Sequence, residues 1–337
     1  MLSCESVCMK KIKEILWGRI YLWGFRPLYR LENLNEGFWH FVNRAAVQHF
    51  KQYGKKELSP LETRIVADLR KTGVAFTSLD ELFGNGDTLL ATLKEQGLRK
   101  EKGRINRTKA YITEYFDEIP TLTTDNPFVR LALDEQALAI TSTYLGMSPK
   151  LQEFTLAEIN AVPPGTEKTG SMRWHRDPHD LRLCKMFIYL SDVTTENGPF
   201  TYVKESNYGN KYRGVFPQKP PSGIYPPPGE VEKRVNPADI QPCTGRAGSV
   251  IFADTSGLHG GGYVKAAHRV MFTAGYLPQK SFLMRVPVYK RGTNEKLSPM
   301  QEYAVAGDES LTSRNIFGML KRAFLGKQSF GTHGTYM

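Results

Sequence analysis

Two histidines and one aspartate stand out because their types and spacing could bind iron. His175 and Asp177 lie two residues apart in the segment Met-Arg-Trp-His-Arg-Asp, and His259 follows much later in the chain. Two imidazoles and one carboxylate on one face of Fe(II) leave three adjacent coordination positions open. A bidentate 2-oxo acid and O2 can take those positions, so the three residues predict an oxygen-activating iron site.

Arg269 and Asn160 are the candidate contacts for an organic co-substrate. Arg269 opens the apolar segment Arg-Val-Met-Phe-Thr-Ala-Gly-Tyr, shortly after His259. A buried guanidinium offers a planar pair of N–H donors that matches a carboxylate, such as the distal carboxylate of 2-oxoglutarate. Asn160 lies in the strand-like run Leu-Ala-Glu-Ile-Asn-Ala-Val and is a further candidate for contacting the co-substrate.

Each of these residues also has an ordinary structural interpretation. His259 could be a buried loop histidine, and Arg269 could pair with a structural acid. A rival ligand is His179, because it shares the strand parity of His175 and Asp177. The order of the segments favours the iron site, since two strand-like stretches in the second half of the chain are separated by a Pro/Gly-rich insert.

The ligands need rigid elements to position them. On a β-strand, residues two apart point to the same side, so a strand through His175 and Asp177 would direct both side chains into one cavity. The run Gly-Ser-Val-Ile-Phe-Ala-Asp-Thr-Ser-Gly-Leu-His, which ends at His259, predicts an apolar strand followed by a turn. That turn would bring the third ligand to the first two.

Helices are expected at both ends of the chain. Apolar spacing predicts a helix over 35–53, and Ser59-Pro-Leu-Glu62 is a capping box that starts a second helix, to about Lys71. A further helix is predicted over 311–324. The expected organisation is a basic and aromatic N-terminal arm and helix (1–57), a helical flank with the first strand (58–150), a β core (151–290) and a C-terminal extension (291–337).

The β core contains the insert, near 205–245. Its stretch Lys-Pro-Pro-Ser-Gly-Ile-Tyr-Pro-Pro-Pro-Gly, residues 219–229, cannot form a regular ladder or helix. We expect a long surface loop over the mouth of the cavity. Long loops in compact domains are often functional, so a lid and a simple surface insertion are both open interpretations.

From about Leu69 to Tyr276 the chain resembles the phytanoyl-CoA dioxygenase family of Fe(II)/2-oxoglutarate oxygenases. The resemblance rests on the Trp-His-Arg-Asp segment, the Glu-Asn-Gly-Pro-Phe turn and strand beginning at Glu196, and the segment with His259 and Arg269. Where many members have Pro-Gly-Ser-His, this chain has Val-Lys-Glu-Ser-Asn from Val203, so its substrate side is expected to be atypical.

The resemblance implies a fold, cofactors and a reaction. The fold is α+β with a mainly β core, a double-stranded β-helix (a cupin-like jelly roll) with flanking N-terminal helices. The cofactors are Fe(II), the co-substrate 2-oxoglutarate and O2, with Arg269 holding the C5 carboxylate. The reaction hydroxylates an unactivated C–H bond of a small-molecule, lipid or acyl-type substrate and converts 2-oxoglutarate to succinate. Related halogenases have a small residue at the position of Asp177, so this carboxylate favours hydroxylation.

Composition constrains partners and location. No apolar run reaches the roughly 18 residues of a membrane span, no secretory signal is recognisable, and the four cysteines lack zinc or disulfide spacing. A cytoplasmic protein is expected. The net charge of +11 suits an anionic substrate, and no nucleic-acid motif is present. The basic and aromatic segment from Lys10 to Arg30 could contact a membrane surface peripherally, or simply pack on the protein.

Two other classes of function stay open. A non-oxidative cupin-like metal protein would keep the histidines without needing Arg269. A membrane-surface binding protein could carry a vestigial site. The substrate and the oligomeric state do not follow from the sequence.

Overall fold

The computed structural model describes residues 30–31, 33–99, 103–106, 109–117, 120–219, 224–281, 287–292 and 295–306. The predicted helix over 311–324 lies outside these residues. The basic and aromatic segment lies outside them too, except for Arg30.

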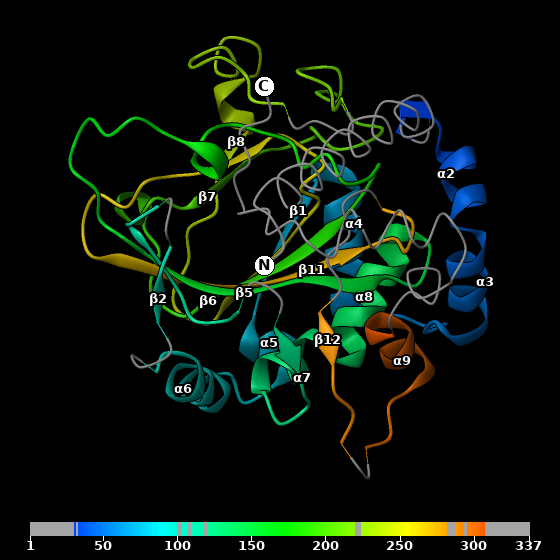
Figure 1. Cartoon of the computed structure of the whole chain (residues 1–337). Helices are drawn as coiled ribbons and strands as arrows, with labels where there is room; N and C mark the ends of the chain where they lie inside the picture. The colour runs from blue at the N-terminus through cyan, green and yellow to red at the C-terminus, as the bar shows by residue number, and fades with distance from the viewer. Residues whose placement is uncertain are drawn as a thin grey trace, which may run out of the picture.

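Two antiparallel sheets face each other and form a double-stranded β-helix, as predicted (Figure 1). The larger, seven-stranded sheet has the order β1 (Val74–Ser78), β9 (Ser249–Ala253), β6 (Cys184–Tyr189), β11 (His268–Leu277), β5 (Lys150–Asn160), β3 (Ile112–Glu114) and β2 (Arg104–Ile105). The smaller sheet has the order β10 (His259–Gly261), β7 (Phe200–Val203) and β8 (Ile240–Pro242). A separate parallel pair joins β12 (Val288–Tyr289) to β4 (Thr121–Leu122).

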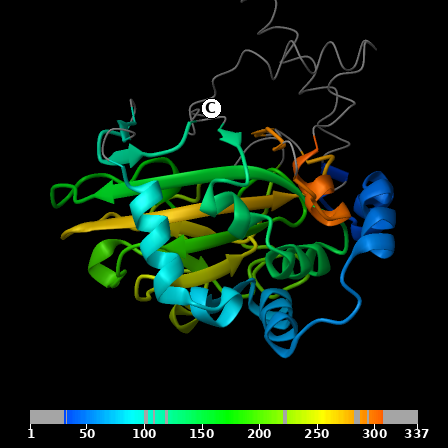
Figure 2. The same cartoon turned by 90° about the horizontal axis from the view of Figure 1, so that it is seen from below.

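Helices pack on the outer face of the larger sheet, with the blue helices α2 and α3 at its edge, as the view from below shows (Figure 2). They are α2 (Glu36–Val42), α3 (Arg44–Tyr53), α4 (Pro60–Thr72), α5 (Leu79–Phe83), α6 (Gly86–Gly97), α7 (Pro127–Ala132), α8 (Glu135–Leu145) and α9 (Pro299–Val305). Among the described residues, three short 3-10 turns lie in the connections: η2 (Gly170–Met172), η3 (Thr195–Asn197) and η4 (Pro237–Asp239).

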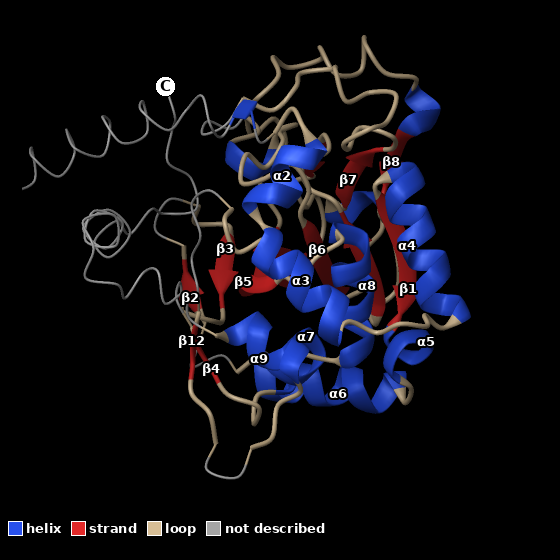
Figure 3. Ribbon diagram, turned by 90° about the vertical axis from the view of Figure 1, so that its right-hand side faces the viewer, coloured by secondary structure: helices blue, strands red, loops and turns tan. Residues whose placement is uncertain are grey.

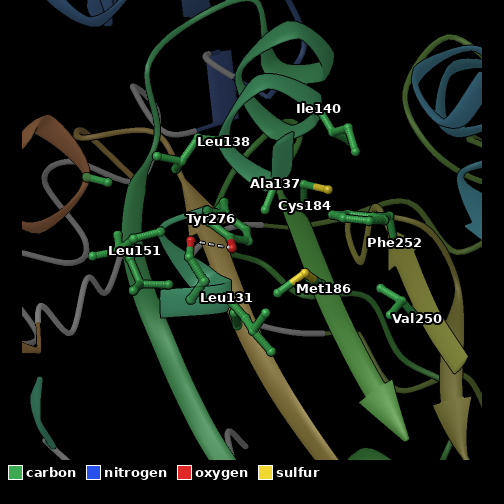
Figure 4. Packing of buried hydrophobic residues seen from close by; sticks show 14 of the residues in the cluster. Leu131, Ala137, Leu138, Ile140, Leu151, Cys184, Met186, Val250, Phe252 and Tyr276 are labelled. Carbon is green, nitrogen blue, oxygen red and sulfur yellow. Dashed lines mark hydrogen bonds between the residues drawn. The ribbon is translucent and has the colours of Figure 1, made fainter. Parts of the chain in front are cut away.

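The two faces of the larger sheet have different roles. Along β6, Cys184, Met186 and Ile188 join the core cluster beneath the helices, whereas Phe187 and Tyr189 face the smaller sheet. This alternation is the two-residue period of a strand. Figure 4 shows the helix side of the core, where side chains from α7 and α8 meet those of the strands: Leu131, Ala137, Leu138, Ile140, Leu151, Cys184, Met186, Val250, Phe252 and Tyr276.

The predicted helices are mostly confirmed. The Ser59 capping box is present and starts α4, which ends at Thr72. The single helix predicted over 35–53 is wrong in one respect, because it is interrupted at Asn43. The Asn43 amide donates to the Trp39 carbonyl (3.1 Å) and its oxygen accepts from the backbone of Lys280 (3.2 Å). The backbone of Asn43 keeps its hydrogen bonds to Trp39 and Val47 (both 3.1 Å), but its φ of −95° and ψ of 20° depart from helical values, and α2 and α3 are separated at this residue.

The insert near 205–245 is not wholly irregular. It contains η4 and β8, and β8 pairs with β7 in the smaller sheet. The long loops gather at the end of the molecule beside β7 and β8 (Figure 3). Among the described residues, no helix is long and apolar enough to cross a membrane.

Candidate metal centre

His175, Asp177 and His259 come together between the two sheets. His175 Nε2 lies 3.8 Å from Asp177 Oδ1, and His259 Nε2 lies 4.0 Å from Asp177 Oδ2. The three candidate ligand atoms all lie within 4.8 Å of one another. Metal–ligand bonds of about 2 Å keep the ligand atoms of one ion within about 4 Å of one another, so one ion can contact this set after small side-chain adjustments. In the part of the chain that the structure describes, no other group of His, Cys, Asp or Glu has this geometry, and His179 is not a member.

The predicted strand through His175 and Asp177 is wrong in form. The segment has only an isolated antiparallel bridge, in which His175 and His259 exchange backbone hydrogen bonds of 2.8 and 2.9 Å. The backbone N–H of Asp177 then donates to the Thr255 carbonyl (2.9 Å). The backbone is thus extended, and its pairing with the β10 region brings all three ligands to one place.

Both imidazoles are oriented for metal binding by their own neighbouring backbone. His175 Nδ1 lies 2.9 Å from the Arg173 carbonyl, and His259 Nδ1 lies 2.9 Å from the Gly257 carbonyl. A carbonyl can only accept, so each Nδ1 carries the proton and each Nε2 keeps a lone pair for a metal. Burial lowers the pKa of both imidazoles. The pKa of His259 falls to about 3, because the neighbouring His175 adds to the effect of burial. Both histidines are therefore neutral ligands at neutral pH.

The Asp177 carboxylate is held by two further side chains. Its Oδ2 accepts from the Thr255 hydroxyl (2.6 Å) and lies 2.9 Å from Lys185 Nζ. Lys185 also pairs with Glu153, at 2.6 Å. Burial alone would raise the pKa of Asp177, but Lys185 and the nearby imidazoles hold it well below its usual range. Since Oδ2 is occupied by these donors, Oδ1 is the oxygen available to a metal.

Arg269 is buried, and two of its guanidinium nitrogens lack hydrogen-bond partners. It is 2% exposed, and its Nε and Nη1 atoms have no hydrogen-bond partner in the protein. Burial lowers its pKa, with the phenol of Tyr189 opposing that shift. Unpaired buried charges are costly, so the orphaned N–H groups point to a missing anion. A carboxylate of 2-oxoglutarate fits this requirement.

The strand register does not favour the predicted role of Asn160. In the β11–β5 register Asn160 is opposite His268, whereas Arg269 is opposite Ile159. Adjacent residues of a strand point to opposite faces, so Asn160 lies on the other face of the sheet from Arg269. His268 is half-exposed on that outer face, 4.0 Å from Glu158. Asn160 is therefore not placed to contact a co-substrate.

Lys185, Thr255 and Lys109 belong to the site but were not predicted from the sequence. Lys185 interrupts the apolar strand Cys-Lys-Met-Phe-Ile-Tyr, and a charged residue in such a strand is a usable signal. Lys109 is 4% exposed, and its ammonium contributes to the lowered pKa of His175. Burial lowers the pKa of Lys109 itself to about 8. No local pattern around Lys109 indicates that it lies near the ligands.

Arg176, between two of the metal ligands, ties the insert to the site. It is 2% exposed and donates only to backbone carbonyls. The acceptors are those of Ser206, Tyr212, Arg213, Val215, Phe216 and Ser256, at 2.6 to 3.3 Å. Gln218 adds a hydrogen bond to the Asp177 carbonyl. This part of the insert is thus a fixed wall behind the ligands.

Replacing Arg176 with methionine is expected to destabilise the fold by about 1.5 to 3 kcal/mol, because buried carbonyls lose charged donors. Urea unfolding followed by circular dichroism measures the change. Lys233→Met is a control, because Lys233 makes an exposed pair with Glu230 and should change stability by less than about 0.5 kcal/mol. Equal effects in the two variants would contradict the structural role of Arg176.

Residues 76–270, more than half of the chain, match the phytanoyl-CoA dioxygenase (PhyH) family. The chain belongs to this family. No curated protein shows significant similarity to the sequence.

Solved structures with a similar fold include the following three proteins. The epimerase SnoN, solved with Fe3+, alpha-ketoglutarate and nogalamycin RO, is 17% identical, covers 67% of this chain and 86% of its own, and has a TM-score of 0.47. HygX from Streptomyces hygroscopicus, solved with nickel, 2-oxoglutarate and hygromycin B, is 20% identical, covers 66% of this chain and 88% of its own, and has a TM-score of 0.44. EvdO2 from Micromonospora carbonacea var. aurantiaca is 16% identical, covers 66% of this chain and 93% of its own, and has a TM-score of 0.40. Such low similarity leaves the substrate to be argued from this chain's own site.

The predicted cofactors agree with the family and with the site. The His–Asp–His group provides the ligand set expected for Fe(II), and the orphaned Arg269 suits the carboxylate of 2-oxoglutarate. Iron and 2-oxoglutarate are therefore assigned as the cofactors of this enzyme of the 2-oxoglutarate oxygenase type.

Proposed function

We propose that the protein is an Fe(II)/2-oxoglutarate-dependent hydroxylase of an anionic small-molecule, lipid or acyl-type substrate. The observation that carries the proposal is the buried triad together with a buried Arg269, with two unpartnered nitrogens, facing the same space between the sheets. A metal protein without 2-oxoglutarate would have no use for this desolvated cation. Iron with 2-oxoglutarate supplies the two-electron oxidation of a C–H bond, coupled to formation of succinate.

The protein's own residues bind and orient the reactants. The carbonyls behind His175 and His259 fix the tautomers, and Thr255 and Lys185 fix the carboxylate of Asp177. Arg269 would hold the distal carboxylate of 2-oxoglutarate and so set its direction relative to the ligands. The buried apolar residues between the sheets, among them Phe187 and Phe200, keep this space free of water.

Asp177 supports hydroxylation over halogenation. A carboxylate held by two donors occupies the position that a halide would need. The cations in and around the site support an anionic substrate or co-substrate. Lys109 lies near His175, Arg173 precedes the ligands, and the whole chain has a net charge of +11. A peripheral membrane contact of the N-terminal segment stays a proposal, tested by sedimentation with anionic vesicles.

Anaerobic titration with Fe(II) and 2-oxoglutarate tests the function. Because 2-oxoglutarate chelates the metal, a weak visible charge-transfer band is expected, and admission of O2 should give stoichiometric succinate. Native mass spectrometry of protein from its own host would identify a retained substrate. A non-oxidative metal protein would bind iron without forming the band, and a protein with a vestigial site would bind no iron.

A further inference from the structure

An aromatic side chain that the proposed function does not use lies over a metal ligand. The Tyr225 ring stacks on the imidazole of His175, with centroids 5.7 Å apart and an angle of 21° between the planes. Tyr225 belongs to the Pro-rich insert, and it is 37% exposed. The ring is therefore close to the metal site and open to the surface at the same time.

Contacts along the neighbouring chain hold this ring in place. Ile224 forms a bridge with Arg176, which is itself buried and fully bonded. The Arg173 guanidinium carbon lies 5.4 Å from the centre of the Tyr225 ring, and its Nη2 donates to the carbonyl of Pro226 (3.4 Å). Pro226 is the first of three consecutive prolines, whose fixed φ restricts the backbone. The position of Tyr225 over His175 is thus built into the fold.

We propose that Tyr225 is a modification site, hydroxylated by the enzyme's own iron centre to 3,4-dihydroxyphenylalanine when no substrate is bound. The inference rests on the proposed function, which supplies the oxidant. In the balanced step, 2-oxoglutarate, O2 and the ring give succinate, CO2 and the hydroxylated ring. A ring C–H bond ortho to the phenol oxygen is replaced by C–OH. One oxygen atom of O2 enters succinate and the other enters the ring. Two electrons come from 2-oxoglutarate and two from the ring.

Phe200 is another aromatic ring near a metal ligand, and its setting differs. Its centroid lies 5.6 Å from that of His259. Phe200 is only 6% exposed and packs in the core with Phe187, at 4.8 Å. It therefore forms the inner wall of the site. Tyr225 is 37% exposed and carries an electron-rich phenol, which is the better target for an electrophilic oxidant. Phe200 serves as an internal comparison.

Oxygen-isotope labelling tests the modification. The full-length holoenzyme is loaded with Fe(II) and 2-oxoglutarate under argon, without substrate, and then exposed to 18O2. Peptide mass spectrometry should find one oxygen-18 atom on Tyr225, and succinate is measured in the same sample. N-oxalylglycine in place of 2-oxoglutarate should prevent labelling. Tyr53→Ala is a matched control, because Tyr53 is exposed and lies outside the site, and Tyr225 should be labelled in it as in the wild type.

The outcomes separate this inference from the proposed function. Succinate formation with an unlabelled Tyr225, or with the label on Phe200, overturns the modification site and leaves the oxygenase intact. Absence of both succinate and label overturns both. An oxygen atom taken from water instead of O2 also contradicts the proposed step.

A second measurement does not depend on turnover. With 3-fluorotyrosine in place of the 16 tyrosines, the signal missing from Tyr225→Phe identifies Tyr225 in the 19F NMR spectrum. Binding of paramagnetic Co(II) should shift or broaden that signal strongly, whereas Zn(II) should not. A Tyr225 signal that Co(II) leaves unchanged would show that the ring is not near the metal and would overturn the inference.

Discussion

Alanine in place of His259 is expected to abolish iron binding and 2-oxoglutarate turnover while leaving the chain folded. The imidazole contributes its Nε2 to a set of only three protein ligands, and no other histidine of the described chain belongs to that set. The expected loss of affinity exceeds 100-fold, and His175→Ala and Asp177→Ala should behave in the same way. Anaerobic Fe(II) binding and the visible band of the 2-oxoglutarate complex measure it.

Thermal unfolding with and without Co(II) gives an independent measure of the same site. An ion at 100 times its dissociation constant stabilises the folded state by about 2.7 kcal/mol, and this increment should vanish in the ligand variants. His179→Ala is the matched control, because His179 lies near Asp177 but outside the ligand group. Loss of iron in His179→Ala with retention in His259→Ala would mean that the third ligand is His179.

The metal ligands could be predicted from the sequence because their chemistry is local and restrictive. Few residue types bind Fe(II). The spacing of His175 and Asp177 therefore still indicates a metal site, even though the backbone there forms an isolated bridge instead of a regular strand. Arg269 was also predictable, since its position at the start of an apolar strand already indicated a buried cation.

The supporting residues depend on how distant segments pair. Whether Asn160 faces inward is decided by the β11–β5 register, and a shift of one residue reverses the face. Lys109 reaches the site from the segment before β3, far from the ligands in sequence. The Pro-rich composition indicated a loop over residues 219–229. The contacts of this region with the site could not be predicted, because the hydrogen bonds of Arg176 and the pairing of Ile224 are tertiary contacts without a local sequence pattern. These features therefore became visible only in the folded chain.

Replacing Arg269 with alanine is expected to weaken 2-oxoglutarate binding by about 2 to 5 kcal/mol, the usual cost of stranding one partner of a buried charge pair. At 1.4 kcal/mol per tenfold change, this is roughly thirty-fold to several thousand-fold in Kd. Arg269→Lys should bind with intermediate affinity, because an ammonium keeps the charge but cannot form two parallel hydrogen bonds with the carboxylate. Anaerobic titration of the visible band with 2-oxoglutarate measures each affinity.

Two properties distinguish a co-substrate anchor from a structural arginine at this position. Iron affinity should stay nearly unchanged in Arg269→Ala, because the guanidinium is not a ligand. Arg269→Met, which retains much of the side-chain volume, should not lower the free energy of unfolding without 2-oxoglutarate, since Nε and Nη1 have no partner in the protein to lose. His268→Ala, Arg246→Ala and Lys265→Ala are the controls. Normal 2-oxoglutarate affinity in Arg269→Ala, with a large loss in one of these three, would move the anchor to that residue.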